Sequence, residues 1–138
     1  MRLRFGDNDS SPERHAENMS TLEIANELVT LVKEGKNAEA IEKLYADNIV
    51  SVEAVAGPQG DTATGIEAVK GKLEWWVSSM EVHEAKVDGP YVSGDQFAVK
   101  YDYDVTDKNS GQRYPMIEVA IYTVAEGKIS HERFFYNM

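Results

Sequence analysis

The 138-residue chain contains no cysteine. Without cysteine the protein forms no disulfide, carries no thiol nucleophile and has no thiolate ligand for a metal. Long apolar runs are also missing, since no stretch approaches the ~18 residues that a membrane-spanning helix needs. The N-terminal residues lack the apolar centre of a secretory signal peptide, so the expected location is the cytoplasm.

Basic residues are scarce. The sequence has 14 lysines and arginines against 24 aspartates and glutamates, which gives a formal net charge of −10. Phosphate backbones and anionic lipids repel such a surface, so neither nucleic acid nor membrane is an expected partner. Hydrophobic residues make up 42% and charged residues 28%, and the length suits one globular domain with its own core.

The first half of the chain predicts a tail followed by helices. Residues 1–18 are polar and contain proline, so we expect a flexible tail and a domain over 19–138. Apolar residues at helical spacing predict one helix from Thr21 to Gly35 and a second that begins at Asn37. The same spacing predicts a third helix over 66–79, after a strand at 49–55 and a loop at 57–65.

The second half predicts four strands, at 82–91, 95–106, 113–125 and 128–136. Alternating apolar and polar residues run through 97–105, the pattern of a strand with one buried face. Helices early in the chain and strands late in the chain predict an α+β domain, with the helices on one face of a curved sheet.

The stretch 116–138 contains the most informative candidate residue. Two strand-like runs flank Glu126 and Gly127, which is a hairpin signature. The first run is apolar on both faces, and Glu118 interrupts the face that also carries Ala120 and Tyr122. An apolar surrounding raises the pKa of a carboxyl and suits it to acid or base catalysis near neutral pH. Alternatively, Glu118 pairs with a buried arginine or tyrosine hydroxyl and only stabilises the sheet.

The opposite face of the same strand also needs a cover. It carries an apolar row of three residues, Ile117, Val119 and Ile121. A second copy of the chain would bury this row, so we expect a homodimer.

Three segments together resemble the NTF2-like superfamily. Residues 44–49 read Leu-Tyr-Ala-Asp-Asn-Ile, residues 65–69 read Gly-Ile-Glu-Ala-Val, and residues 126–129 read Glu-Gly-Lys-Ile, followed by Glu-Arg-Phe-Phe-Tyr at 132–136. Their order resembles the SnoaL-like branch, whose relatives include ketosteroid isomerases and polyketide cyclases. The resemblance covers 20–138. It implies a cystatin-like cone, in which three N-terminal helices pack on a strongly curved, mainly antiparallel sheet around a pocket for a hydrophobic small molecule.

The resemblance also implies candidate catalytic residues. Family enzymes move protons with pocket carboxylates, usually without a metal or an organic cofactor. The carboxylate base of the isomerases corresponds to Glu53 here, whereas their tyrosine donor corresponds to a position near Leu28. Their second acid corresponds to Ala120, two residues after Glu118. The oxyanion hole of the isomerases is therefore not reproduced, which argues against steroid isomerisation. A solvated charge at the end of a strand is the alternative interpretation of Glu53.

The last strand adds a third carboxylate. Glu132 alternates with Phe134 and Tyr136, so it is expected to face inward and could share a proton with Glu118. The aromatic candidates for lining a pocket are Tyr101, Tyr103, Tyr122, Tyr136 and Trp76, although core packing is the simpler interpretation for most of them.

These patterns predict a small-molecule pocket and leave catalysis open. The enzyme hypothesis is acid–base chemistry of the isomerase, cyclase or lyase type, with no cofactor. No His-x-x-x-His motif or comparable carboxylate cluster occurs, so no metal is expected. The alternative hypothesis is a non-catalytic ligand-binding protein or a dimeric scaffold.

Overall fold

The structure is a computed structural model that describes residues 19–57 and 60–137. The described residues form three helices, α2 (Thr21–Lys33), α3 (Asn37–Leu44) and α4 (Ile66–Ser79). They also form six strands, β1 (Tyr45–Gly57), β2 (Gly60–Thr64), β3 (Met80–Ser93), β4 (Gln96–Asp107), β5 (Arg113–Ala125) and β6 (Lys128–Phe135). The expected tail at 1–18 lies outside the described residues.

Local sequence explains both ends of α2. Ser20 and Glu23 form a capping box, in which the Ser20 hydroxyl accepts from the Glu23 backbone N–H and the Glu23 carboxylate accepts from the Ser20 N–H. At the other end Gly35 adopts a positive φ of 75°, and the N–H of Lys36 donates to the carbonyl of Leu31 at 2.8 Å. This is the Schellman arrangement that ends many helices at glycine.

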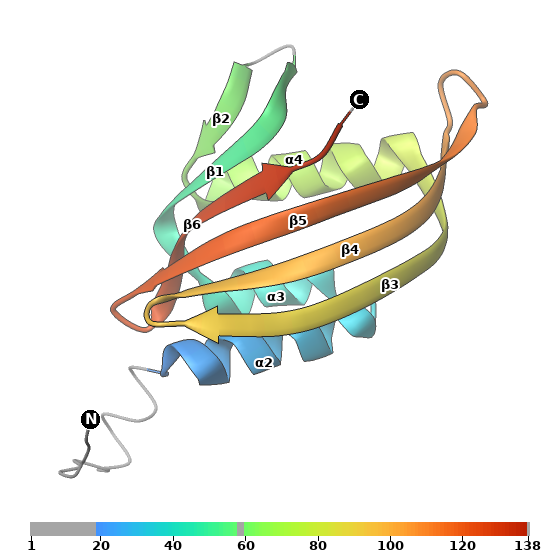
Figure 1. Cartoon of the computed structure of the whole chain (residues 1–138). Helices are drawn as coiled ribbons and strands as arrows, with labels where there is room; N and C mark the ends of the chain where they lie inside the picture. The colour runs from blue at the N-terminus through green and yellow to red at the C-terminus, as the bar shows by residue number, and fades with distance from the viewer. Residues whose placement is uncertain (1–18, 58–59, 138) are drawn as a thin grey trace, which may run out of the picture.

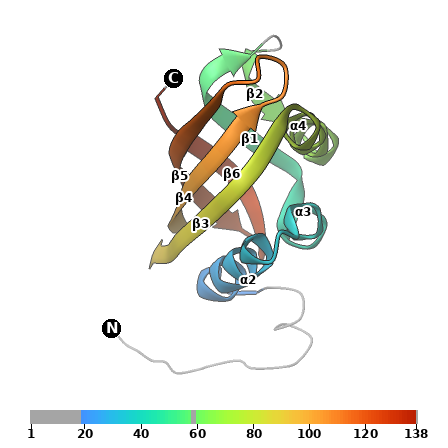
Figure 2. The same cartoon turned by 90° about the vertical axis from the view of Figure 1, so that its right-hand side faces the viewer.

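All six strands join one sheet, in the order β2-β1-β6-β5-β4-β3. Neighbouring strands are antiparallel except β1 and β6, which run parallel. Figure 1 shows the sheet curving across the molecule, and the turned view in Figure 2 shows the three helices together on one side of it. The predicted α+β class, with helices on one face of a mainly antiparallel sheet, is confirmed.

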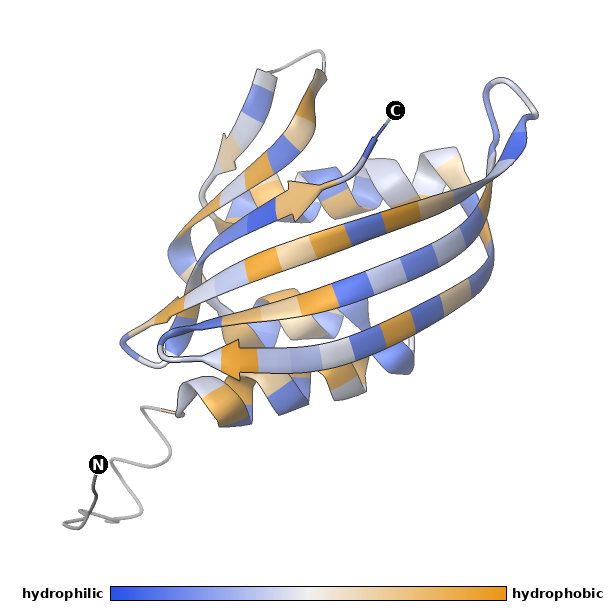
Figure 3. Ribbon diagram, in the orientation of Figure 1, coloured by the Kyte–Doolittle hydropathy of each residue, from blue (hydrophilic) through white to orange (hydrophobic). Residues whose placement is uncertain are grey.

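Side chains alternate between the two faces of the sheet. On β4, Phe97, Val99 and Tyr101 are buried toward the helices, while Lys100 is exposed on the outer face. Figure 3 shows this alternation as bands of orange and blue along the strand. The inner face meets the apolar side of α2, where Ile24, Ala25, Leu28, Val29 and Leu31 are buried. Full burial of a side chain such as leucine stabilises a fold by about 1.5–3 kcal/mol, so this contact contributes substantially to stability.

Two local expectations were wrong. The segment expected as a loop contains β2, which pairs with β1 through Ser51 and Ala63. The strand expected at 49–55 begins earlier, at Tyr45, directly after α3 ends at Leu44. The cause of both differences is tertiary, because pairing with the sheet satisfies backbone groups that local propensity would leave in a loop or a helix end. In the part of the chain that the structure describes, no helix is long and apolar enough to span a membrane.

Candidate functional site

Glu118 lies on β5 and faces the helices, as the alternation of the strand predicted. It pairs in register with Tyr101 of β4 and is only partly exposed. Within the described residues its carboxyl makes no hydrogen bond or ion pair. The pKa of Glu118 is raised from 4.5 to about 7. Burial is the largest cause, the negative charges of Glu53 and Glu132 add to it, and the ammonium of Lys72 opposes them. A carboxyl in this condition exchanges a proton readily at neutral pH.

Glu132 also faces inward, but both of its oxygens are occupied. The side chain is 3% exposed. The hydroxyl of Tyr45 donates to Oε1, and the hydroxyl of Ser51 donates to Oε2 at 2.6 Å. Burial raises the pKa of Glu132, whereas these two hydrogen bonds lower it. No hydrogen bond joins Glu132 to Glu118 in the described part of the chain, so the proton sharing expected from the sequence stays a prediction.

Glu53 lies on β1, and its side chain is partly exposed. Its side chain is 28% exposed and forms an ion pair with Lys72 of α4. The hydroxyl of Tyr136 donates to its other oxygen at 2.9 Å. Hydrogen bonding to Glu53 contributes, after burial, to raising the pKa of Tyr136 to about 12. The structure therefore gives Glu53 two partners inside the fold and does not leave it as a solvated charge at a strand end.

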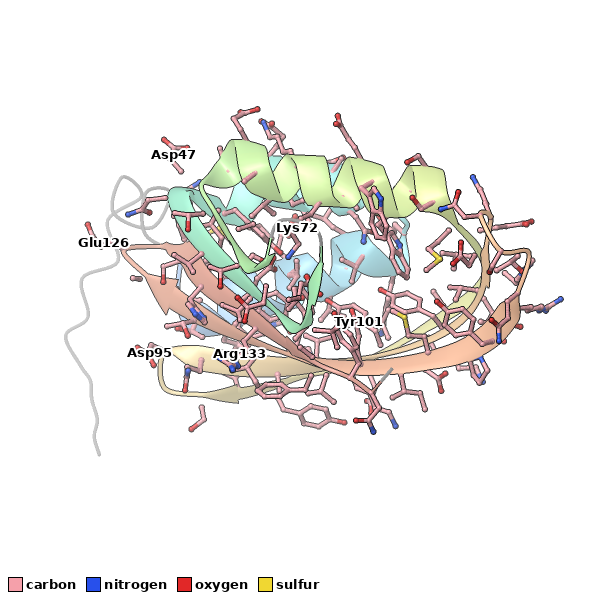
Figure 4. The ribbon with its side chains drawn as sticks, turned by 90° about the horizontal axis from the view of Figure 1, so that it is seen from above. Asp47, Lys72, Asp95, Tyr101, Glu126 and Arg133 are labelled. Carbon is pink, nitrogen blue, oxygen red and sulfur yellow. The ribbon has the colours of Figure 1, made fainter. Side chains whose placement is uncertain are left out.

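Three residues of this site were missed in the sequence, namely Tyr45, Ser51 and Lys72. The ammonium of Lys72 donates to Ser51 Oγ at 2.7 Å. Figure 4 shows Lys72 and Tyr101 between α4 and the curved sheet. A signal for Lys72 was present, because a lysine three residues after Val69 and four before Trp76 falls on the inner stripe of the helix. Ser51 shares its strand face with Ile49 and Glu53, which also pointed inward.

The aromatic candidates divide into core and site. Tyr101 and Tyr122 are buried, and their hydroxyl oxygens lie 2.7 Å apart in a hydrogen bond. Tyr122 also stacks on Phe97, with ring centroids 4.8 Å apart, so it belongs to the core. Tyr103 and Trp76 are partly exposed and contact each other at a centroid distance of 5.8 Å. Burial holds the pKa values of Tyr101, Tyr103 and Tyr122 above the ordinary value, so their hydroxyls stay neutral.

A hollow of about 340 Å³ lies beside β3, β4 and β5, apart from the carboxylates. None of Glu53, Glu118 and Glu132 lines it. Its walls are charged and aromatic, formed by Glu84, Lys86, Asp102, Tyr103, Asp104, Arg113, Tyr114 and Pro115. Among residues 19–57 and 60–137, no group of three histidine, aspartate or glutamate side chains is arranged to hold a metal ion.

The arrangement is suited to moving protons. Glu118 carries a proton that is easily lost near pH 7, and it faces a polar cluster formed by Lys72, Glu53 and Glu132. The tyrosine hydroxyls nearby stay neutral and can act as hydrogen-bond donors. The site has carboxylates of two kinds. Glu118 has no hydrogen-bond partner among residues 19–57 and 60–137, whereas Glu53 and Glu132 are held by hydrogen bonds. Such a difference in environment separates reactive from structural acids.

Comparison with known proteins identifies the family. The SnoaL-like domain family matches residues 19–136. A proposed SnoaL-like polyketide cyclase from Mesorhizobium loti has a solved structure that is 49% identical in sequence, covers 86% of this chain and 100% of its own, and superposes with a TM-score of 0.82. No curated protein matches the chain.

More distant structures share the fold. An NTF2-like protein from Burkholderia thailandensis is 18% identical, with a TM-score of 0.73 and coverage of 86% of this chain and 91% of its own. A protein with a cystatin-like fold from Xanthomonas campestris is 20% identical, with a TM-score of 0.68 and coverage of 87% and 92%. The resemblance drawn from the sequence is confirmed, and the chain belongs to the SnoaL-like domain family.

Proposed function

We propose that this protein binds a small hydrophobic molecule between α4 and the sheet and that Glu118 transfers a proton to or from it. The reaction is of the isomerase, cyclase or lyase type and needs no cofactor. The observation that carries the proposal is the position of Glu118, a carboxyl that lies beside Tyr101 and Tyr103 on the inner sheet face and has no hydrogen-bond partner in the part of the chain that the structure describes. An ionised acid in such a place lowers the stability of the fold, so its presence there points to a function.

The family supports the class of chemistry. The relative from Mesorhizobium loti is a proposed SnoaL-like polyketide cyclase. Ring closure at a carbon next to a carbonyl begins with removal of a proton from that carbon, which is a task for a general base. Glu118 is suited to this task because its pKa of about 7 lets it accept and return a proton at the same pH. Glu132 is assigned a supporting role, since its oxygens already accept from Tyr45 and Ser51.

Isotope exchange into a model ketone tests the proposal. 2-Tetralone is bicyclic and hydrophobic and has exchangeable protons next to its carbonyl. Proton NMR in D₂O should show faster loss of these protons with the wild-type protein, and Glu118→Gln should reduce the catalysed rate by about 10²–10⁴-fold. Glu74→Gln, an exposed position on α4, is the matched control and should keep the wild-type rate. Equal rates for wild type and Glu118→Gln would refute the catalytic role.

A second function is favoured by the packing of the cone. Tyr101 and Tyr103 stack with their ring planes 3° apart, and Trp76 packs on Tyr103, so aromatic rings occupy much of the interior. A filled interior suits a binding or scaffold protein without catalysis. Under this alternative 2-tetralone exchange stays at the rate of the control without protein.

The outer face supports a homodimer. Ile117 is 52% exposed, and Phe135 on the neighbouring strand is 49% exposed. Val119 pairs with Phe135, and Ile121 pairs with Arg133, so the apolar residues of β5 and β6 form a continuous patch. A second copy of the chain presents the same patch and would cover it without any other partner.

A further inference from the structure

The helix α4 contacts the domain through few apolar side chains. Val69 is its one fully buried residue, whereas α2 buries five. Lys72 provides the polar contact, because its ammonium reaches Ser51 and Glu53 on β1. The same ammonium lies 5.4 Å from the ring centroid of Phe134 on β6. A lysine on the inner side of a helix therefore links that helix to two strands.

Lys72 also joins two separate carboxylates into one hydrogen-bonded chain. On one side it pairs with Glu53, which accepts from a tyrosine hydroxyl. On the other side it donates to Ser51, which donates to Glu132. From the partly exposed end to the buried end, the chain consists of Tyr136, Glu53, Lys72, Ser51, Glu132 and Tyr45.

We propose that Lys72 is a positioning residue of the Glu118 site. Its ammonium holds Glu53 and Ser51 in place and lies over Phe134, which pairs with Ala120 two residues after Glu118 on β5. The inference rests on the function proposed above for Glu118. Among the described residues, Lys72 is the one positively charged group that acts on Glu118 from a neighbouring element, and the others are carboxylates or tyrosines. These groups are Tyr101 and Tyr103 from β4, Glu53 from β1, Glu132 from β6, Tyr136 beyond β6 and Lys72 from α4.

The charges around Glu118 explain how Lys72 affects its ionisation. Glu53 and Glu132 both disfavour the ionised form of Glu118, and the ammonium of Lys72 favours it. Without the ammonium, two negative charges would face Glu118 with no positive charge in the described cluster. Glu118 would then ionise at a higher pH and would act less readily as a base at neutral pH. Lys72 thereby acts on the chemistry through Glu118 and without itself contacting a substrate.

Titration of Glu118 by carbon-13 NMR in three variants tests the role of Lys72. Lys72→Met keeps the apolar stem and removes the charge, and the Glu118 titration should move up by about 0.5–1 pH unit. Lys72→Arg keeps the charge and should restore the wild-type titration to within ~0.3 pH unit. Lys70→Met is the matched control on the same helix. Because Lys70 pairs with Glu42 and Glu67, away from the cone, this variant should leave the titration unchanged.

The signal of Glu118 is assigned by its loss in Glu118→Gln. Should Lys72→Met fail to fold, Lys72→Gln retains a donor for Ser51 without the charge and should give the same upward shift. An unchanged Glu118 titration in the uncharged variants would overturn the proposal and leave Lys72 as a structural link.

The two proposals fail separately. A shift in the Lys72 variants, together with no 2-tetralone exchange by the wild type, would support Lys72 as the residue that tunes Glu118 and refute catalysis. Exchange of 2-tetralone protons by the wild type, together with an unchanged Glu118 titration in the Lys72 variants, would support catalysis and refute the role of Lys72.

Discussion

Replacing Glu118 with glutamine tests whether the acid at this position lowers the unfolding free energy of the protein. Glutamine keeps the size of the side chain and removes its charge. The folded protein holds the pKa of Glu118 at about 7, and the ordinary value is 4.5. Between these two pH values the folded state binds more protons than the unfolded state. Wild-type stability therefore falls as the pH rises through this range.

The size of the effect follows from the pKa change. The difference between 4.5 and 7 corresponds to a penalty of up to about 3 kcal/mol, at 1.36 kcal/mol for each pH unit. The penalty is fully present above pH 7, where Glu118 is ionised in both states, and absent below pH 4.5, where it is protonated in both. Glu118→Gln should exceed the wild type in unfolding free energy by up to about 3 kcal/mol at pH 8 and by close to zero at pH 4.

Urea unfolding at one-unit steps from pH 4 to pH 8 measures this difference. Glu74→Gln, on the exposed side of α4, should differ from the wild type by less than ~0.5 kcal/mol at every pH. A constant offset between Glu118→Gln and the wild type, or a less stable variant at pH 8, would refute the reasoning. Glu118→Leu adds a second check. It should also fold, because no described side chain would lose a hydrogen-bond partner, and a loss of several kcal/mol would favour a structural role.

Three further predictions concern the rest of the molecule. Tyr45→Phe removes one of the two donors to buried Glu132 and should cost about 1–3 kcal/mol in urea unfolding, whereas an unchanged stability would mean that water replaces the hydroxyl. Ile121→Lys places a charge in the outer patch and should convert a dimer into a monomer by light scattering; a wild-type monomer at micromolar concentration would exclude the dimer. Deletion of residues 1–18 should shift the thermal midpoint by less than about 5 °C, and a larger loss would show that the segment packs on the domain.

The elements with strong local signals were predictable from the sequence. The alternation along β4, the Glu126 and Gly127 turn and the glycine after α2 each specify a structure over a few residues. The alternation of faces along β5 predicted that Glu118 points inward. Its pairing in register with Tyr101, which is buried on the inner face, confirms this direction. Such features depend on side-chain period and backbone angles, which neighbouring residues largely decide.

The partners within the site were not predictable in the same way. Glu132 and its donor Tyr45 are 87 positions apart in the chain, and they meet only because β1 pairs with β6. Strand 60–64 likewise has no apolar pattern of its own and exists through pairing with β1. Helical spacing places Lys72 on the inner side of α4 but does not reveal its partners, because they lie on β1. Contacts between distant segments are set by topology, which a local pattern does not contain.

The place of β6 in the sheet also governs the order of events during folding. β6 is the last strand in the sequence, yet it lies between β1 and β5 and holds hydrogen bonds to both. A growing chain therefore has two unjoined parts of a sheet, β1 with β2 and β3 with β4 and β5, until residues near 135 emerge from the ribosome. Both unjoined parts expose strand edges that can pair with other chains. Synthesis that stops a few residues before β6 would leave a protein prone to aggregation, however stable the finished domain is.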